Sequence, residues 1–245
     1  MKYASSDFFH YTNSLETVKK ILTGGFGMFY CREDLYQKKG VVEHIAIPMV
    51  CFCDIPLGFI SSNTYGKYII GMKRSWGIRV GLMPVMYYPN NCKRTSTKDV
   101  MKAVQAFKNN RSDAAKYLIL GYSKPIRKIG KSSNKHPRPK NNYLEREWRK
   151  IYSASSSYRW KSDEEYDIYR GDVTSPKAPV GSSVCFGEND VDMIIVPQSE
   201  VSSLIKFISG TSFCKLGGKQ GMVKTNQRIR LISTIIPFES LVNNV

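Results

Sequence analysis

The sequence predicts a single α+β domain over residues 1–245, and three observations support this. The chain has 245 residues with 42% hydrophobic side chains, enough for one substantial core. A clear helical pattern lies near the N-terminus, and stretches typical of strands are scattered over the remaining sequence. These stretches do not alternate regularly with helices, as they would in a parallel βαβ fold.

The first two expected elements are a strand and a helix. Residues 8–12, FFHYT, have the composition of a short aromatic strand. Over residues 13–25 an apolar stripe runs from Leu15 to Leu22 at helical spacing, Asn13 is placed to cap the helix, and a glycine pair ends it. The N-terminal region therefore predicts a strand followed by an amphipathic helix.

The later elements follow from apolar runs and the breakers between them. In chain order we expect a loop with a short helical turn over 25–44, a buried strand over 45–57, strands over 65–72 and 82–89, helices over 95–110 and 112–121, a strand passing into a helix over 192–208, and a last strand over 229–241.

Positive charge is concentrated in the middle of the chain. Of the net charge of +17, residues 57–144 carry +16, from eighteen basic side chains against Asp99 and Asp113. This predicts an electrostatic surface for nucleic acid, an acidic protein or a phosphate-bearing ligand, although a generally basic soluble surface is the alternative. Within it, residues 122–140 contain no acid, and we expect an exposed loop there. Its basic residues, the candidates for contacting a nucleic acid or partner, are Lys124, Arg127, Lys128, Lys131, Lys135, Arg138 and Lys140.

Several classes of protein are disfavoured by what the sequence lacks. It has no apolar run of eighteen residues and no secretory signal pattern at its start, so we expect a soluble cytoplasmic protein without a membrane partner. Its six cysteines are scattered, which indicates reduced thiols and no metal site. The glycine-rich nucleotide motifs and the metalloprotease motif are also absent. Carboxylates, tyrosines and one histidine remain as candidate catalytic groups.

That histidine is His10, in the predicted strand 8–12. Thr12 would share its face, because side chains alternate along a strand. Such a pair could offer hydrogen bonds to a sugar or an amide, and a purely structural histidine is the alternative. Tyr65 and Tyr68 lie among basic residues, where an aromatic ring could stack on a base or a nicotinamide or simply pack in the core.

Glu145 and Glu147 form an ExE pair in the segment NNYLEREWRKIY, residues 141–152. On a strand the two side chains would share a face about 7 Å apart, with Arg149 next in the row. At an effective dielectric constant of about 20 their repulsion would be roughly 2.4 kcal/mol, enough to raise one pKa unless Arg149 screens it. On a helix, Asn142 would cap and Glu145 would pair with Arg149. Periodicity leaves both alternatives open.

Several motifs in order resemble the AbiGi family of abortive phage-resistance proteins. They are FFHYT, ILTGGF, IPMVCFCDIPLG, YGKYIIGMKRSWGIRVGLMPVMYY and NYLEREWRK, spread over residues 8–152. The resemblance implies a role in phage defence within a toxin–antitoxin style pair, and the family is commonly labelled as the antitoxin.

A second resemblance, weaker than the first, is to ADP-ribosyltransferases, in the order of an H-x-T strand, a helix, an FxD strand and a late ExE. It implies a split β-sheet core with flanking helices and NAD as a substrate. By position, His10 would hold the ribose of NAD, Thr12 would lie near the nicotinamide, and Tyr65 or Tyr68 would stack on its ring. Glu147 would orient the ribose hydroxyl and stabilise the cationic centre, and Glu145 would activate the acceptor.

Two functions therefore remain open. The first is a phage-defence ADP-ribosyltransferase that uses NAD, without a metal, to modify a nucleic acid or a nucleic-acid-associated acceptor. The alternative is a non-catalytic antitoxin or scaffold that binds a partner toxin or DNA through its basic surface. An RNA-binding module without a partner enzyme is a third reading.

Overall fold

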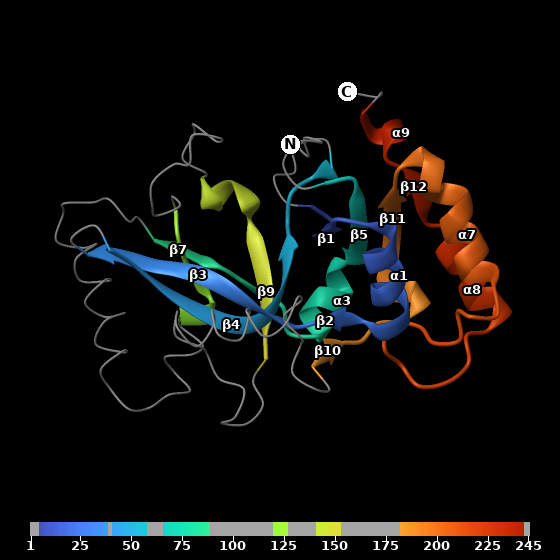
Figure 1. Ribbon diagram of the computed structural model, residues 1–245, viewed down its shortest axis with the longest axis horizontal. Coiled ribbons are helices and arrows are strands. Elements are labelled where there is room, and N and C mark those ends of the chain that lie inside the picture. The colour runs from blue at the N-terminus through green and yellow to red at the C-terminus, as the bar shows by residue number, and fades with distance from the viewer. Residues whose placement is uncertain are drawn as a thin grey trace. The chain divides into compact units, whose positions relative to one another are not determined.

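The computed structural model describes residues 5–38, 41–57, 66–88, 120–126, 141–152 and 182–242, and its fold is α+β (Figure 1). The chain divides into two compact units. The first consists of residues 1–27, 51–82 and 182–245, and the second of residues 28–50 and 83–181. None of the helices in the described segments is long and apolar enough to cross a membrane.

The first unit is built on a mixed sheet. Its strands follow the order β12-β11-β5-β1, and the last residues of β4 pair with β1, where Cys53 lies opposite Phe9. Among these described strands, β11 and β12 pair in parallel and the other pairs are antiparallel. The bounds are β1 Asp7–Thr12, β4 Val41–Cys53, β5 Tyr68–Lys73, β11 Val191–Val196 and β12 Ile235–Pro237.

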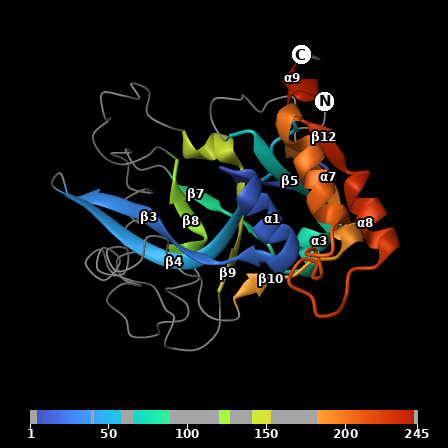
Figure 2. The same cartoon turned by 45° about the vertical axis from the view of Figure 1, so that its right-hand side comes forward.

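Helices and short strands complete this unit, and α7 packs beside α8 in both ribbon views (Figures 1 and 2). The helix expected over 13–25 is confirmed as α1, but its cap is Ser14 and not Asn13, because the Ser14 side chain accepts a hydrogen bond from the amide of Thr17. The bounds are α1 Leu15–Gly24, β2 Phe26–Gly27, α3 Arg74–Arg79, β10 Ser183–Val184, η4 Glu188–Asp190, η5 Gln198–Glu200, α7 Val201–Ser209, α8 Thr225–Ile232 and α9 Glu239–Val242.

Two apolar clusters lie on the two faces of β1. Phe9 packs with Ile69, Ile195 and Phe238 on one face. On the face of His10, which alternates with Phe9, the rings of a second cluster contact one another. The aromatic members of this second cluster are Phe26, Phe52, Trp76 and Phe186.

The second unit contains the long antiparallel hairpin of β3 and β4, drawn in blue in Figure 2. β9 lies next to β4 in strand order, and β6 pairs with β9. A separate two-stranded sheet joins β7 and β8 in parallel. The bounds are β3 Phe29–Lys38, β6 Met83–Pro84, β7 Met86–Tyr88, β8 Ser123–Pro125, η2 Asn142–Glu145 and β9 Glu147–Ile151.

The structure confirms some expected elements and corrects others. Strands over 45–57 and 65–72 are present, as is the strand and helix over 192–208. The expected loop over 25–44 was wrong, since β3 pairs with β4 there. The expected last strand over 229–241 is reduced to the short β12, which lies between the end of α8 and α9. The helices expected over 95–110 and over most of 112–121 lie outside the described residues.

Candidate functional site

The segment that carries the ExE pair folds as a four-residue turn followed by a strand, so the strand alternative is confirmed from Glu147 onward, and the expected helix capped by Asn142 does not form. Asn141 caps the 3₁₀ helix η2 by accepting a hydrogen bond from the amide of Tyr143 at 3.1 Å. Arg146 then adopts a left-handed backbone with φ of 44°, and β9 begins at Glu147. Glu145 therefore belongs to the turn and Glu147 to the strand.

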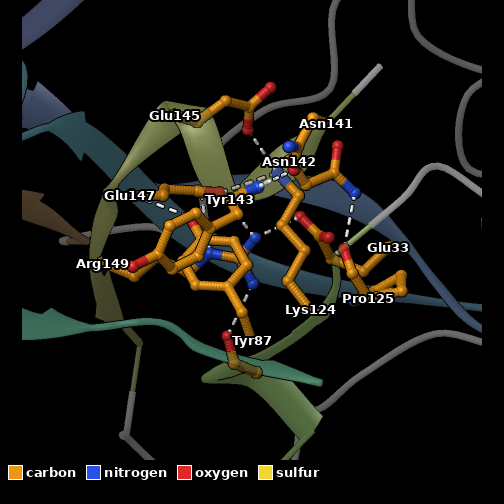
Figure 3. Close-up of polar contacts among 11 residues, drawn as sticks. Glu33, Tyr87, Lys124, Pro125, Asn141, Asn142, Tyr143, Glu145, Glu147 and Arg149 are labelled. Atoms are coloured by element: carbon orange, nitrogen blue, oxygen red, sulfur yellow. Dashed lines mark hydrogen bonds and ion pairs between the residues drawn. The ribbon is translucent and has the colours of Figure 1, made fainter. Parts of the chain in front are cut away.

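Arg149 is the buried centre of the site. It alternates with half-buried positions on β9 and shares the buried face of that strand with Glu147. Its Nε and Nη2 atoms donate to the two oxygens of Glu147 at 2.7 and 3.0 Å (Figure 3). The guanidinium also donates to Glu33 Oε1 at 2.7 Å and to the carbonyl of Gly121 at 2.8 Å. This two-pronged contact with Glu147 is the strong arrangement that guanidinium and carboxylate groups form.

Lys124 joins the two carboxylates of the ExE pair. From β8 its ammonium lies 2.7 Å from Glu145 Oε2 and 2.7 Å from Glu147 Oε2 (Figure 3). Burial alone would lower the pKa of Lys124, but the negative charges of Glu147, Glu33 and Glu145 outweigh burial and raise the pKa above its ordinary value. Lys124 is therefore charged at neutral pH.

Two further side chains complete the buried network. Burial raises the pKa of Glu33, and the neighbouring charges of Arg149 and Lys124 partly offset that rise. The hydroxyl of Tyr87 accepts a hydrogen bond from the amide of Glu147 at 2.9 Å, and burial raises the pKa of Tyr87. We use the term ion network for Glu33, Tyr87, Lys124, Glu145, Glu147 and Arg149.

The ion network limits what its carboxylates can do chemically. Glu147 accepts two hydrogen bonds from Arg149 and one from Lys124, so both of its oxygens are engaged by cations. Glu145 and Glu147 are 8% and 6% exposed. A carboxylate held in this way has little capacity left to accept a proton or to approach a substrate cation unless the network opens.

His10, Thr12 and Tyr68 belong to the first unit and lie on one face of its sheet. His10 pairs with Ile70 across the strands, and Thr12 with Tyr68. The Tyr68 hydroxyl donates to Glu200 Oε1 at 3.1 Å. The structure thus brings these three residues together, and it brings Glu145 and Glu147 together in the second unit.

The protonation of His10 follows from its contacts. Its Nδ1 lies 2.9 Å from the carbonyl oxygen of Cys51, which can only accept, so Nδ1 carries the proton. Burial between the rings of Phe26 and Phe52 lowers the pKa of His10, partly offset by the bond to Cys51. Nε2 is then an acceptor, and among the described residues no hydrogen bond to it is made.

Other predicted site residues lie outside the described segments. These are Tyr65, Arg127, Lys128, Lys131, Lys135, Arg138 and Lys140. Lys124, expected in an exposed loop, lies on β8 with only 15% of its side chain exposed. Over the described segments no group of three or more His, Cys, Asp or Glu is arranged to hold a metal ion.

Sequence reasoning missed the ion network as a unit. Arg149 was expected to screen the pair on a strand or to pair with Glu145 on a helix, and Glu33 was not a candidate. The spacing of two between Glu147 and Arg149 was a usable signal, since it places both on one face of a strand. Nothing local marks Glu33, which reaches Arg149 across 116 residues of sequence.

The fold and the site together define an α+β protein in which an ExE pair is buried in a network of ion pairs. Comparison with known proteins then gives the family. The model of the family described as abortive phage resistance protein AbiGi, antitoxin, matches residues 25–197, and the chain belongs to this family. The chain is also 26% identical over 227 residues to the abortive phage resistance protein AbiGi of Lactococcus lactis subsp. cremoris, covering 80% of this chain and 87% of that protein. No solved structure matches significantly.

Proposed function

We propose that this chain is the non-catalytic, antitoxin-type member of an abortive infection pair and acts by binding a toxin protein. The observation that carries the proposal is the ion network. In it Lys124 forms ion pairs with both carboxylates of the ExE pair, and Arg149 forms one with Glu147. The same residues that could act in catalysis serve here to tie β8, β9 and η2 together.

Opening the ion network would cost free energy. Separating one partner of a buried ion pair leaves an uncompensated charge, which costs about 3–5 kcal/mol. Glu147 would have to lose contacts with both Lys124 and Arg149 before it could stabilise a substrate cation. A structural role requires no such step.

The charge of the second unit supports binding of an acidic partner. That unit holds 24 basic and 12 acidic side chains, a net charge of +12 of the total +17. Complementary charge accelerates association and disfavours wrong partners. The description of the family as an antitoxin supports a toxin as that partner.

The proposal is tested by the charge-neutral variant Glu145→Gln, expressed from the complete locus in cells challenged with phage. The amide oxygen of Gln can still accept a hydrogen bond from Lys124, so folding should be kept. We expect phage resistance at the wild-type level. Loss of resistance with normal protein abundance would overturn the non-catalytic proposal.

ADP-ribosyl transfer from NAD is a second candidate, favoured by the fixed tautomer of His10. The bond to Cys51 leaves Nε2 as an acceptor for a ribose hydroxyl, and Thr12 lies two residues along the same strand. In this candidate the fold contains an ADP-ribosyltransferase-like core, with Tyr65 or Tyr68 stacking on the nicotinamide. Tyr68 fits that role less well, because its hydroxyl is bound to Glu200.

In this second candidate Glu147 orients the ribose and Glu145 activates the acceptor, after both have separated from Lys124 and Glu147 has also separated from Arg149. Purified chain incubated with labelled NAD and total cell RNA, DNA and protein discriminates the two. Label transfer that disappears in Glu147→Gln would establish the enzyme. The non-catalytic proposal expects no label above background in any of the three pools.

A further inference from the structure

The turn that precedes β9 presents two apolar side chains to solvent. We call residues 141–146 the anchor turn. Its Tyr143 and Leu144 side chains are 57% and 65% exposed, whereas its Asn142 and Glu145 are 6% and 8% exposed. Burying exposed apolar side chains against a partner lowers the free energy, so two such neighbours on one turn are available for a contact.

Hydrogen bonds and an ion pair on its buried side fix the anchor turn. The amide of Asn142 donates to the carbonyl of Ile126 at 2.7 Å, and its Nδ2 donates to the carbonyl of Pro125 at 2.9 Å. Glu145 is fixed by its ion pair with Lys124. The two outward side chains are therefore carried on a backbone whose inward side chains are all bonded (Figure 3).

The backbone of the turn is also strained. Arg146 has φ of 44°, the left-handed region that non-glycine residues seldom occupy. Such conformations cost about 1–3 kcal/mol and persist where the surroundings enforce them, often at functional positions. Arg146 is the C-cap of η2 and directly precedes β9, so its conformation belongs to the turn that carries Tyr143 and Leu144.

We propose that the anchor turn is the docking element of this protein, with Tyr143 and Leu144 inserting into an apolar depression on an acidic toxin protein. This inference rests on the proposed function above. Tyr143 suits the role because its ring already packs edge-on against Tyr87, with ring centroids 5.4 Å apart. A preorganised aromatic loses little side-chain entropy on binding, and tyrosine is common among residues that dominate binding energy.

The chemistry of the partner follows from two properties of this unit. Its net charge of +12 favours an acidic partner. The side chain of Leu144 has no polar atom with which to contact a phosphate or a base edge, so a protein surface with an apolar centre and an acidic rim suits the turn better than a nucleic acid.

The experiment measures the affinity of the purified full chain for the purified product of the gene adjacent to its own, by titration calorimetry. The variant Tyr143→Ser/Leu144→Ser removes both projecting groups. Its control, Met222→Ser/Ile229→Ser, removes two apolar side chains of the first unit that are 86% and 63% exposed. We expect the anchor-turn variant to bind at least about 30-fold more weakly and the control to stay within about twofold of wild type.

The outcomes separate this inference from the proposed function. Wild-type affinity in the Tyr143→Ser/Leu144→Ser variant would overturn the anchor turn as the docking element and leave the antitoxin proposal standing. Absence of binding by the wild-type chain would overturn both. Loss of binding to a DNA fragment from the upstream region, with protein binding unchanged, would overturn the choice of a protein partner. An unaltered thermal midpoint of both variants confirms that they are folded.

Discussion

At the scale of single residues, Arg149 determines what the ExE pair can be. It is fully buried and satisfied by Glu147, Glu33 and the carbonyl of Gly121. A buried guanidinium requires several acceptors, because removing an ion from water costs several kcal/mol. Glu147 is therefore one of the acceptors that make burial of Arg149 tolerable.

Replacing Arg149 should destabilise the protein strongly. In Arg149→Met, Glu147 and Glu33 lose their bonds to the guanidinium while remaining buried, and we expect a loss of about 3–5 kcal/mol in the free energy of unfolding. Urea denaturation measures this loss. Lys206→Met removes one positive charge from an exposed position in α7 and should change the free energy by less than about 1 kcal/mol. Equal effects of the two substitutions would contradict a structural role for Arg149.

The raised pKa of Lys124 predicts how the network responds to alkaline pH. Below the pKa of about 10.4 that Lys124 has in the unfolded chain, the folded and the unfolded chain both keep its proton. Its contribution to the free energy of unfolding is then complete. Above that pKa, the unfolded chain loses the proton while the folded chain retains it, so this contribution falls by about 1.4 kcal/mol per pH unit. The stability difference between wild type and Lys124→Met should be constant from pH 7 to 10 and should shrink above that range. A difference that grows with pH in urea titrations would contradict the ion pairs.

At the scale of elements, local chemistry predicted the helices and strands whose signals lie within a few residues. α1 was predictable from its apolar stripe and glycine end, with the cap misplaced by one residue. β3 was not, because its strand character comes from pairing with β4 and not from a period of its own. The segment 141–152 was ambiguous because it contains a capped turn and a strand in succession.

The glycine pair that ends α1 gives a test at this scale. Gly25 has φ of 80°, and a side chain there would lie 2.9 Å from the carbonyl oxygen of Val184, whereas a side chain on Gly24 would meet nothing within 4 Å. We expect Gly25→Ala to lower the thermal midpoint, with a destabilisation of about 1–3 kcal/mol. Gly24→Ala should be neutral or stabilising by up to about 1 kcal/mol. A Gly24→Ala variant less stable than Gly25→Ala would contradict the described end of α1.

At the scale of the whole molecule, the sequence indicated the family and the concentration of charge. The AbiGi motifs and the basic middle region were both visible without a structure. The candidate site was only half predictable. Glu145 and Glu147 were candidates from the sequence, but Lys124, which pairs with both, comes from β8, and Glu33, which pairs with Arg149, comes from β3. No local pattern indicates contacts between such distant segments.

The central claim at this scale is that the chain defends by binding and not by catalysis. An assay of phage resistance uses the complete locus, and it can be carried out without knowing a substrate or an acceptor. A variant that removes the charge of Glu145 while keeping its hydrogen bond to Lys124 therefore isolates the catalytic requirement. The anchor-turn variant serves as the matched comparison, because it leaves every carboxylate in place.

The most direct test is the efficiency of plating of phage on cells carrying the complete locus, and the growth of these cells without phage, compared between wild type, Glu145→Gln and Tyr143→Ser/Leu144→Ser at equal protein abundance. Binding without catalysis predicts wild-type resistance with Glu145→Gln and, because the toxin is no longer held by the chain, inhibited growth in the absence of phage with the anchor-turn variant. Loss of resistance with Glu145→Gln, alongside normal growth of the anchor-turn variant without phage, would contradict it.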